Sequence, residues 1–121
     1  MKTLVFGASL KPHRYSHLAV KKLVANGIET LAFGLREGNI DGVEIQTHLE
    51  MMEGIDTVTL YMNPQRQKPF YQKIIDLKPR RVIFNPGTEN PEFWELLQQH
   101  HIAVEVACTL VLLSTNQYAT A

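Results

Sequence analysis

Short runs of β-branched and apolar residues alternate along this chain with segments whose apolar residues recur at helical spacing. The strand-like runs are Leu4–Phe6, Thr30–Phe33, Val43–Ile45, Thr57–Tyr61, Arg81–Phe84 and Ala103–Val106. Because such alternation is typical of βαβ units, it predicts an α/β fold of three layers, a doubly wound and mostly parallel sheet with helices on both faces. Right-handed crossovers favour the first strand near the middle of that sheet.

The helical segments are marked by their ends. Residues 15–26 carry apolar side chains at helical spacing, and Gly27 is expected to end this helix in a left-handed conformation. After Asn63-Pro64 we expect a helix whose start is limited by Pro69 and which ends before Pro79. Two further helices are expected after Asn90-Pro91 and over residues 109–114, whereas 34–39 reads as a loop and 49–52 as weakly helical.

Length and charge restrict the class of protein. The 121 residues suffice for one domain spanning 1–121, and Lys plus Arg balance Asp plus Glu at 12 each. A net charge of zero argues against a broad surface for nucleic acid or for a membrane. The start of the chain lacks a signal-peptide pattern and no apolar run has the length of a membrane span, so we expect a cytoplasmic protein.

The loop after the first strand has the composition of a phosphate site. Gly7-Ala8-Ser9 follows the strand, and Lys11, Arg14 and Ser16 lead into the first helix. A helix N-terminus presents unpaired N–H groups and a partial positive charge, and serine hydroxyls and an arginine fork add donors for an anion. The loop matches neither the G-x-G-x-x-G nor the triphosphate-binding pattern. A turn glycine with a capping serine and no ligand is the alternative reading.

The end of the second strand bears on the choice of ligand. Folds that bind NAD usually place an acidic residue there, whereas this chain has Arg36 near that point. An arginine suits a ribose with an additional phosphate, as in NADP or coenzyme A (CoA). A solvated loop arginine explains the residue equally well. In a sheet of this kind, ligands bind outside the carboxyl ends of the strands, here the loops 7–16, 34–41, 62–65, 85–90 and 107–109.

Four blocks of sequence carry a family resemblance. They are Val5-Phe6-Gly7-Ala8-Ser9 with the following Lys11-Pro12, Arg14-Tyr15-Ser16 and Ala19; Asp56-Thr57-Val58-Thr59-Leu60-Tyr61; Phe84-Asn85-Pro86-Gly87-Thr88-Glu89-Asn90; and Ala107-Cys108-Thr109-Leu110. Together they resemble the stand-alone CoA-binding domain family, Rossmann-like proteins similar to the CoA-binding domain of succinyl-CoA synthetase α subunits. The resemblance covers nearly the whole chain, with the blocks in the family's order.

The resemblance implies a ligand and its contacts. CoA or a CoA thioester would lie over the carboxyl edge of the sheet, its phosphates held by the first loop. The implied contact residues there are Gly7, Ala8, Ser9, Arg14 and Ser16, with Tyr61, Met62, Pro86 and Gly87 lining the path of the adenine or pantetheine arm. Many relatives carry Asn-Pro where this chain has Gly34-Leu35. This difference affects the contacts expected on the adenosine side.

The implied function is a regulatory or accessory CoA-binding module that catalyses no reaction by itself. One alternative is an NADP-dependent oxidoreductase, for which no convincing Tyr-Lys or His-Asp pair is found. The other is a protein-interaction domain with a vestigial nucleotide pocket. A homodimer and an unidentified protein partner both stay open.

The remaining reactive side chains form no evident catalytic or metal site. Cys108 follows the last strand and could face a CoA thiol, but a small residue at a strand end is the simpler reading. His13 and His17 flank the first loop and are expected mainly as exposed polar residues. Glu89 has no evident carboxylate or histidine partner in the sequence, so general acid–base work is unsupported.

Overall fold

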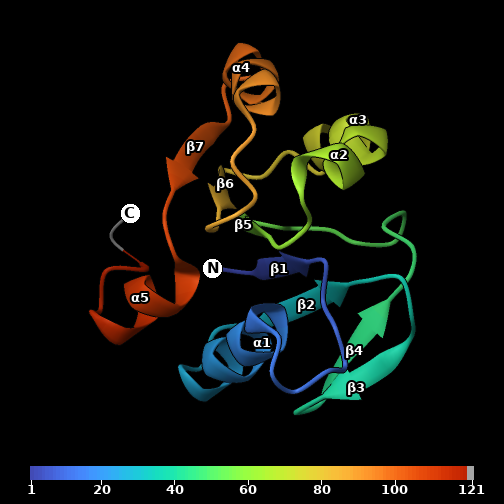
Figure 1. Cartoon of the computed structure of the whole chain (residues 1–121), viewed down its shortest axis with the longest axis vertical. Helices are drawn as coiled ribbons and strands as arrows, with labels where there is room; N and C mark the ends of the chain where they lie inside the picture. Colours follow the sequence, from blue (N-terminus) through green and yellow to red (C-terminus); the bar gives the residue numbers. More distant parts are fainter. Residues whose placement is uncertain (120–121) are drawn as a thin grey trace.

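The structure is a computed structural model that describes residues 1–119, which form a seven-stranded sheet flanked by helices (Figure 1). The strands are β1 (Thr3–Phe6), β2 (Thr30–Phe33), β3 (Gly38–Ile40), β4 (Val43–Gln46), β5 (Thr57–Leu60), β6 (Arg81–Phe84) and β7 (Ala103–Val106). The helices are α1 (Tyr15–Ala25), α2 (Pro64–Gln67), the 3-10 helix η1 (Lys68–Phe70), α3 (Tyr71–Asp76), α4 (Pro91–Gln99) and α5 (Thr109–Ser114).

The strand order is β3-β4-β2-β1-β5-β6-β7, and every pair except β3–β4 is parallel. The chain passes from β1 to β2 on one side and later returns to place β5 on the other side of β1. Figure 1 shows α1 and α5 on one face of the sheet and α2, α3 and α4 on the other. The predicted doubly wound, Rossmann-like α/β fold is therefore confirmed, with the first strand in the middle.

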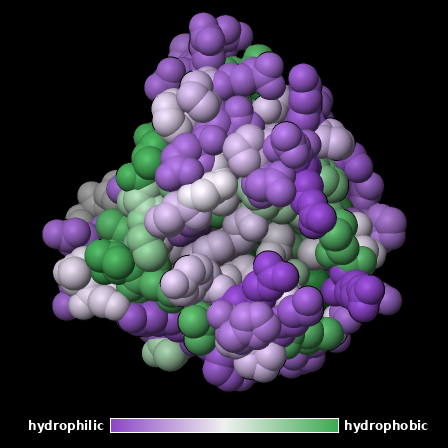
Figure 2. Space-filling model, viewed as in Figure 1, coloured by the Kyte–Doolittle hydropathy of each residue, from purple (hydrophilic) through white to green (hydrophobic). Residues whose placement is uncertain are grey.

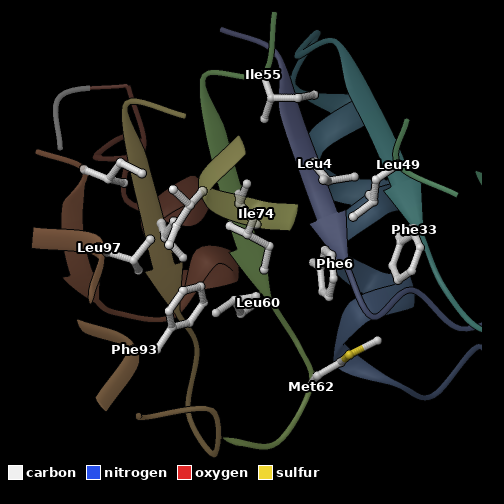
Figure 3. Close-up of a cluster of buried hydrophobic side chains, with 14 of the residues drawn as sticks. Leu4, Phe6, Phe33, Leu49, Ile55, Leu60, Met62, Ile74, Phe93 and Leu97 are labelled. Atoms are coloured by element: carbon white, nitrogen blue, oxygen red, sulfur yellow. The ribbon is translucent and has the colours of Figure 1, made fainter. Parts of the chain in front are cut away.

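Two apolar clusters hold the three layers together. Alternate residues of β1 face opposite helices, so that Leu4 and Phe6 pack toward α3 and α4, and Val5 packs toward α1. Figure 3 shows the first cluster, in which Phe6 stacks on Phe33 with ring centroids 4.7 Å apart. Because both faces are covered, all four residues of β1 are buried, as expected for a central parallel strand.

The stretch predicted as a loop over 34–39 contains a strand that the sequence analysis missed. β3 pairs antiparallel with β4 through a two-residue turn at Asp41 and Gly42, whose φ angles are 49° and 90°. Two positive φ values in succession define the hairpin turn that Asp-Gly favours. β3 has weak strand propensity of its own, so its pairing with β4 and the burial of Ile40 make it a strand.

Two helical predictions also need correction. The segment after Asn63 begins its helix at Pro64, and its regular hydrogen bonding is interrupted around Pro69, which lacks an N–H. It therefore consists of α2, η1 and α3 in succession. Residues 49–52 form a turn, closed by a bond from the Met52 N–H to the Leu49 carbonyl. Both side chains are buried in the first cluster, so packing holds this segment in place.

No helix among residues 1–119 is long and apolar enough to cross a membrane. The face of the molecule in Figure 2 is largely hydrophilic, and an apolar area lies at its left over β7 and α5. Val106 and Val111, from these two elements, are more than half exposed.

Candidate functional site

A cleft of about 860 Å³ lies at the carboxyl ends of β1, β2, β5 and β6. It opens where the chain connections diverge to either side of β1, the position at which ligands of doubly wound sheets bind. All the binding residues predicted from the sequence line this cleft: Gly7, Ala8, Ser9, Lys11, Arg14, Ser16, Arg36, Tyr61, Met62, Pro86 and Gly87. Segments far apart in the sequence thus contribute to one concave surface.

Further lining residues were missed by the sequence analysis: Leu10, Tyr15, Leu35, Asn63, Arg66 and Thr88. Most of them are immediate neighbours of predicted residues in the same loops. Arg66 is the most consequential addition because it brings a cation to the β5–β6 side of the cleft. The sequence indicated this position, because Asn63-Pro64 marks the start of a helix directly after a strand. The first turn of that helix, which contains Arg66, therefore lies at the carboxyl edge of the sheet.

The N-terminus of α1 is open toward the cleft. Arg14 occupies the N-cap position and provides no side-chain cap. Within the described residues, the first-turn N–H groups of Tyr15, Ser16 and His17 have no hydrogen-bond partner. The Ser16 side chain is only 5% exposed, lines the cleft and likewise makes no hydrogen bond. The unpaired N–H groups, together with the Ser16 hydroxyl at the cleft, form a set of donors suited to an anion.

Two other helices that start at the same edge of the sheet are capped. Asn63 accepts a hydrogen bond from the Arg66 N–H at 3.0 Å, and Asn90 accepts one from the Phe93 N–H at 3.3 Å. Each is followed by a proline in the first helical turn. These ends satisfy their own backbone donors, as structural helix starts usually do. The open end of α1 therefore differs from these two helix starts.

Glycines set the shape of the first loop. Gly7 has φ of 102°, and an added Cβ there would lie 3.1 Å from the Met62 Cγ. An added Cβ on Gly34 would lie only 2.5 Å from the Ala8 carbonyl oxygen. The first loop thus lies directly against the residues that follow β5 and β2. Gly34 is the residue that allows this close approach.

Hydrogen bonds fix the same loop. The N–H groups of Gly7 and Ala8 both donate to the Phe33 carbonyl at 2.8 Å. The Ser9 hydroxyl oxygen accepts from the Lys11 N–H at 3.1 Å, which leaves the hydroxyl proton available. The His17 Nδ1 lies 2.9 Å from the Ser9 carbonyl oxygen. His13 is exposed as expected, whereas His17 is half-buried and bonded to the loop.

The charges around the cleft are all of one sign. Lys11, Arg14, Arg36 and Arg66 line it, and no Asp or Glu does so within the described part of the chain. None of these four cations forms one of the ion pairs found among residues 1–119. On a chain with a net charge of zero, this cluster produces a local positive potential at the sheet edge.

The β5–β6 side of the cleft is held by buried amides. Gln67 is fully buried and donates to the Met62 and Thr88 carbonyls at 2.8 and 2.9 Å, tying together the loops after β5 and β6. Asn85 donates to the Leu60 carbonyl at 2.8 Å and accepts from the Thr109 N–H at 2.8 Å. Because their polar groups are bonded internally, these side chains shape the cleft without offering free donors.

Tyr61 is the titratable group on this side. Its hydroxyl is buried and makes no hydrogen bond of standard geometry. Burial raises the pKa of Tyr61 well above its ordinary value, an effect partly offset by the Thr109 and Thr59 hydroxyls. The phenol is therefore protonated at neutral pH.

The two other reactive side chains considered in the sequence lie outside the cleft lining. Cys108 is half-buried at the N-cap of α5, and it is not among the residues that line the cleft. The Glu89 carboxylate accepts the Gly87 N–H at 2.8 Å, so it stabilises the turn after β6. Among residues 1–119, no group of three or more His, Cys, Asp and Glu side chains could hold a metal ion.

The fold and the cleft define a doubly wound α/β protein with a cationic crevice at its topological switch point. The pattern of the CoA-binding domain family matches residues 1–114, and the chain belongs to this family. This confirms the resemblance seen in the sequence blocks. No protein with a curated description matches the chain.

Solved structures agree on the fold. An uncharacterised protein is 46% identical over 96% of both chains, with a TM-score of 0.92. A protein from Thermus thermophilus is 23% identical, with a TM-score of 0.84 over 96% of this chain and 89% of its own. A hypothetical protein from Pyrococcus horikoshii is 22% identical, with a TM-score of 0.81 over 90% of this chain and 78% of its own. At such identities the last two support the fold alone.

Proposed function

We propose that the chain is a regulatory or accessory module that binds CoA, or a CoA thioester, in the cleft at the carboxyl edge of the sheet. The observation that carries this proposal is the combination of four cations, no lining carboxylate and the uncapped N-terminus of α1. Membership of the CoA-binding domain family supports the choice of ligand. A small polyanion would supply the counter-charges that the described residues leave out.

In this proposal the phosphates bind on the β1–β2 side of the cleft. The open N–H groups of α1 and the Ser16 hydroxyl would hold the diphosphate, and Arg14 would pair with its oxygens. Arg36, in the loop after β2, would take the additional phosphate on the ribose. Lys11 would neutralise charge as a point cation, which its flexible stem suits.

The less polar parts of the ligand fit the other side. Met62, Pro86 and Gly87 offer apolar and backbone surface there, next to the Tyr61 ring. The adenine or pantetheine arm would lie on this surface. The lining residues include no carboxylate, thiol or imidazole within the described chain, and the Tyr61 phenol stays protonated. This composition supports binding without turnover.

The direct test is isothermal titration calorimetry of the full chain with CoA, acetyl-CoA, dephospho-CoA and NADP. We expect CoA or acetyl-CoA to bind more tightly than NADP. The Arg14→Ala/Ser16→Ala variant should lose about 10- to 100-fold in affinity, since it removes charge-assisted and hydroxyl contacts to phosphate. Lys68→Ala is the matched control, because it deletes a cation that does not line the cleft.

Several outcomes would contradict the proposal. Absence of both heat and a thermal shift with either CoA form would exclude the proposed ligand. An unchanged affinity in the Arg14→Ala/Ser16→Ala variant would exclude the proposed site. Preferential binding of NADP, with hydride transfer to a panel of carbonyl compounds, would favour an oxidoreductase. Chromatography of acetyl-CoA after incubation with the protein tests turnover, and we expect the thioester to be recovered intact.

A further inference from the structure

His17 makes a contact that the proposed ligand chemistry does not use. Its Nδ1 lies 2.9 Å from the Ser9 carbonyl oxygen, and the two residues are eight positions apart in the sequence. A carbonyl oxygen only accepts hydrogen bonds, so the imidazole must carry its proton on Nδ1. The ring is half-buried on α1, and its Nε2 is left as the acceptor when the ring is neutral.

This bond ties the first loop to α1. The other hydrogen bonds of residues 9–14 span at most four positions: from the Lys11 N–H to the Ser9 hydroxyl, from the Arg14 N–H to the Lys11 carbonyl and from the Leu18 N–H to the Arg14 carbonyl. Among the described residues, His17 forms the one side-chain hydrogen bond that joins residues 8–13 to α1. The orientation of the Ser9–Leu10 peptide therefore depends on this imidazole.

The orientation of that peptide matters for an anion. A carbonyl oxygen directed at a phosphate would repel it, whereas an N–H would attract it. In a trans peptide the C=O and the N–H point in opposite directions. With the Ser9 oxygen fixed on His17, the Leu10 N–H points the other way, and it has no partner among residues 1–119. Leu10 lines the cleft.

We propose that His17 is a positioning residue of this site: its Nδ1–H holds the Ser9 carbonyl against α1 and so keeps the loop's carbonyl dipole away from the bound phosphates. The proposal rests on the proposed phosphate site of CoA and concerns the His17 side chain, because His17 is not among the residues that line the cleft. The imidazole acts through the peptide that it orients. The free loop would otherwise sample orientations in which the carbonyl faces the cleft.

The test compares three variants of the full chain. His17→Ala should weaken CoA binding about tenfold, because one neutral hydrogen bond that orders the loop is lost. His17→Asn should restore the affinity to within about threefold of wild type, since its amide N–H can reach the same carbonyl. His13→Ala is the matched control in the same loop, an exposed histidine outside the cleft lining, and should bind like wild type.

A merely structural role gives a different pattern. In that case His17→Ala would lower the urea midpoint of unfolding while the folded protein kept its full affinity for CoA, and this result would overturn the proposal. Equal loss of affinity in His17→Asn and His17→Ala would overturn it as well.

Failure of the proposed function can be told apart from failure of this inference. If wild-type protein does not bind CoA, the proposed function fails. The role of His17 is then decided by nitrogen–proton correlation spectra of the free protein, which identify the imidazole tautomer. An Nδ1–H tautomer, with faster Leu10 amide exchange in His17→Ala than in His17→Asn, supports the positioning role. An Nε2–H tautomer, or equal exchange in the two variants, refutes it.

Discussion

The arginines at the two ends of the sheet have opposite environments. At the amino ends, Arg81 is 1% exposed and its guanidinium donates to Thr57, Glu105 and the Tyr118 carbonyl, at 2.8 to 2.9 Å. The guanidinium carbon also lies 4.4 Å from the Tyr118 ring centroid. At the carboxyl ends, the guanidinium groups of Arg14, Arg36 and Arg66 line the cleft and form no ion pair with another residue among residues 1–119.

Arginines whose donors are bonded within the fold stabilise the structure, whereas arginines without such partners are available to bind a ligand. A buried guanidinium must have its donors satisfied within the fold, because desolvation without partners costs several kcal/mol. The arginines of the cleft keep contact with water, so the fold supplies no partner for them. Arg80 is exposed, and it pairs with Asp56 at 3.0 Å beside Arg81. Variants at the amino ends should therefore affect stability, and variants at the carboxyl ends should affect binding.

The largest expected effect is at Arg81. Arg81→Ala should lower the free energy of unfolding by about 3–5 kcal/mol, because Glu105 loses its partner and the C-terminal segment loses its bond at Tyr118. Urea denaturation measures the loss. Arg81→Met combined with Glu105→Gln should recover part of it, since neither charge is then left unpaired. A loss of CoA affinity in folded protein, with stability unchanged, would contradict the comparison.

A substitution at Gly34 should weaken CoA binding as well as stability, with a moderate effect. In Gly34→Ala the new Cβ would meet the Ala8 carbonyl oxygen at 2.5 Å, so the first loop has to move. Overpacking of this kind costs about 1–3 kcal/mol, and the displaced loop should weaken CoA binding at least about tenfold. Gly42→Ala is the control, because its Cβ would meet nothing within 4 Å and only the backbone would be strained.

For Gly42→Ala, calorimetry should find the wild-type affinity for CoA. Urea denaturation should find the free energy of unfolding lowered by about 1 kcal/mol, the usual cost of a side chain at positive φ. Equal binding by Gly34→Ala and Gly42→Ala would show that the contact between Gly34 and the first loop has no role in the site.

Arg36 is expected to have a smaller and selective effect. Arg36→Ala should weaken CoA binding by about 1.5 kcal/mol, roughly tenfold, through loss of a charge-assisted bond to the ribose phosphate. Dephospho-CoA, which lacks that phosphate, should bind wild type and variant alike. Raising the salt concentration should reduce the difference between CoA and dephospho-CoA, because exposed charges are screened. Equal losses for the two ligands would assign Arg36 to another part of the cleft.

The smallest effect concerns acid stability at the amino ends. The Arg80 hydrogen bond holds the pKa of the Asp56 carboxyl below its ordinary value, assisted by the Thr57 hydroxyl. A lowered folded-state pKa stabilises the fold at neutral pH, and that contribution is lost as the pH falls from about 4 through the folded value.

Asp56→Asn should cost less than about 1 kcal/mol at pH 7 and make the stability less dependent on pH below 4. Denaturation series at pH 3 and pH 7 measure both effects. If the free energy of unfolding of the variant falls below pH 4 as steeply as that of wild type, other carboxyl groups cause the loss of stability in acid.

The sequence predicted the layers and the strand at the centre because local signals repeat along the chain. A strand that ends at Gly7 and a helix that ends at Gly27 are properties of short windows, and chirality then limits the topology. The cleft position followed from the same rule, since the carboxyl ends of parallel strands share one edge. The Asp41-Gly42 turn was also readable, but its hairpin was missed because β3 has so little strand propensity.

Other features depend on contacts between distant residues. Neither the composition of the first loop nor the spacing of its polar side chains indicates that His17 bonds the Ser9 carbonyl, or that Gly34 fits against Ala8. The pairing of Arg81 is likewise absent from any local pattern, because its partners lie at least 24 positions away.

The sequence by itself thus predicted the three layers, the edge of the sheet at which the cleft lies and the residue types available there. The tertiary structure alone decided which cations are paired and which are free. The physical reason is that burial and partner distance set the cost of a charge, and both depend on how the strands are packed. The same side chain, arginine, therefore holds the fold together at one end of the sheet and is proposed to hold a ligand at the other.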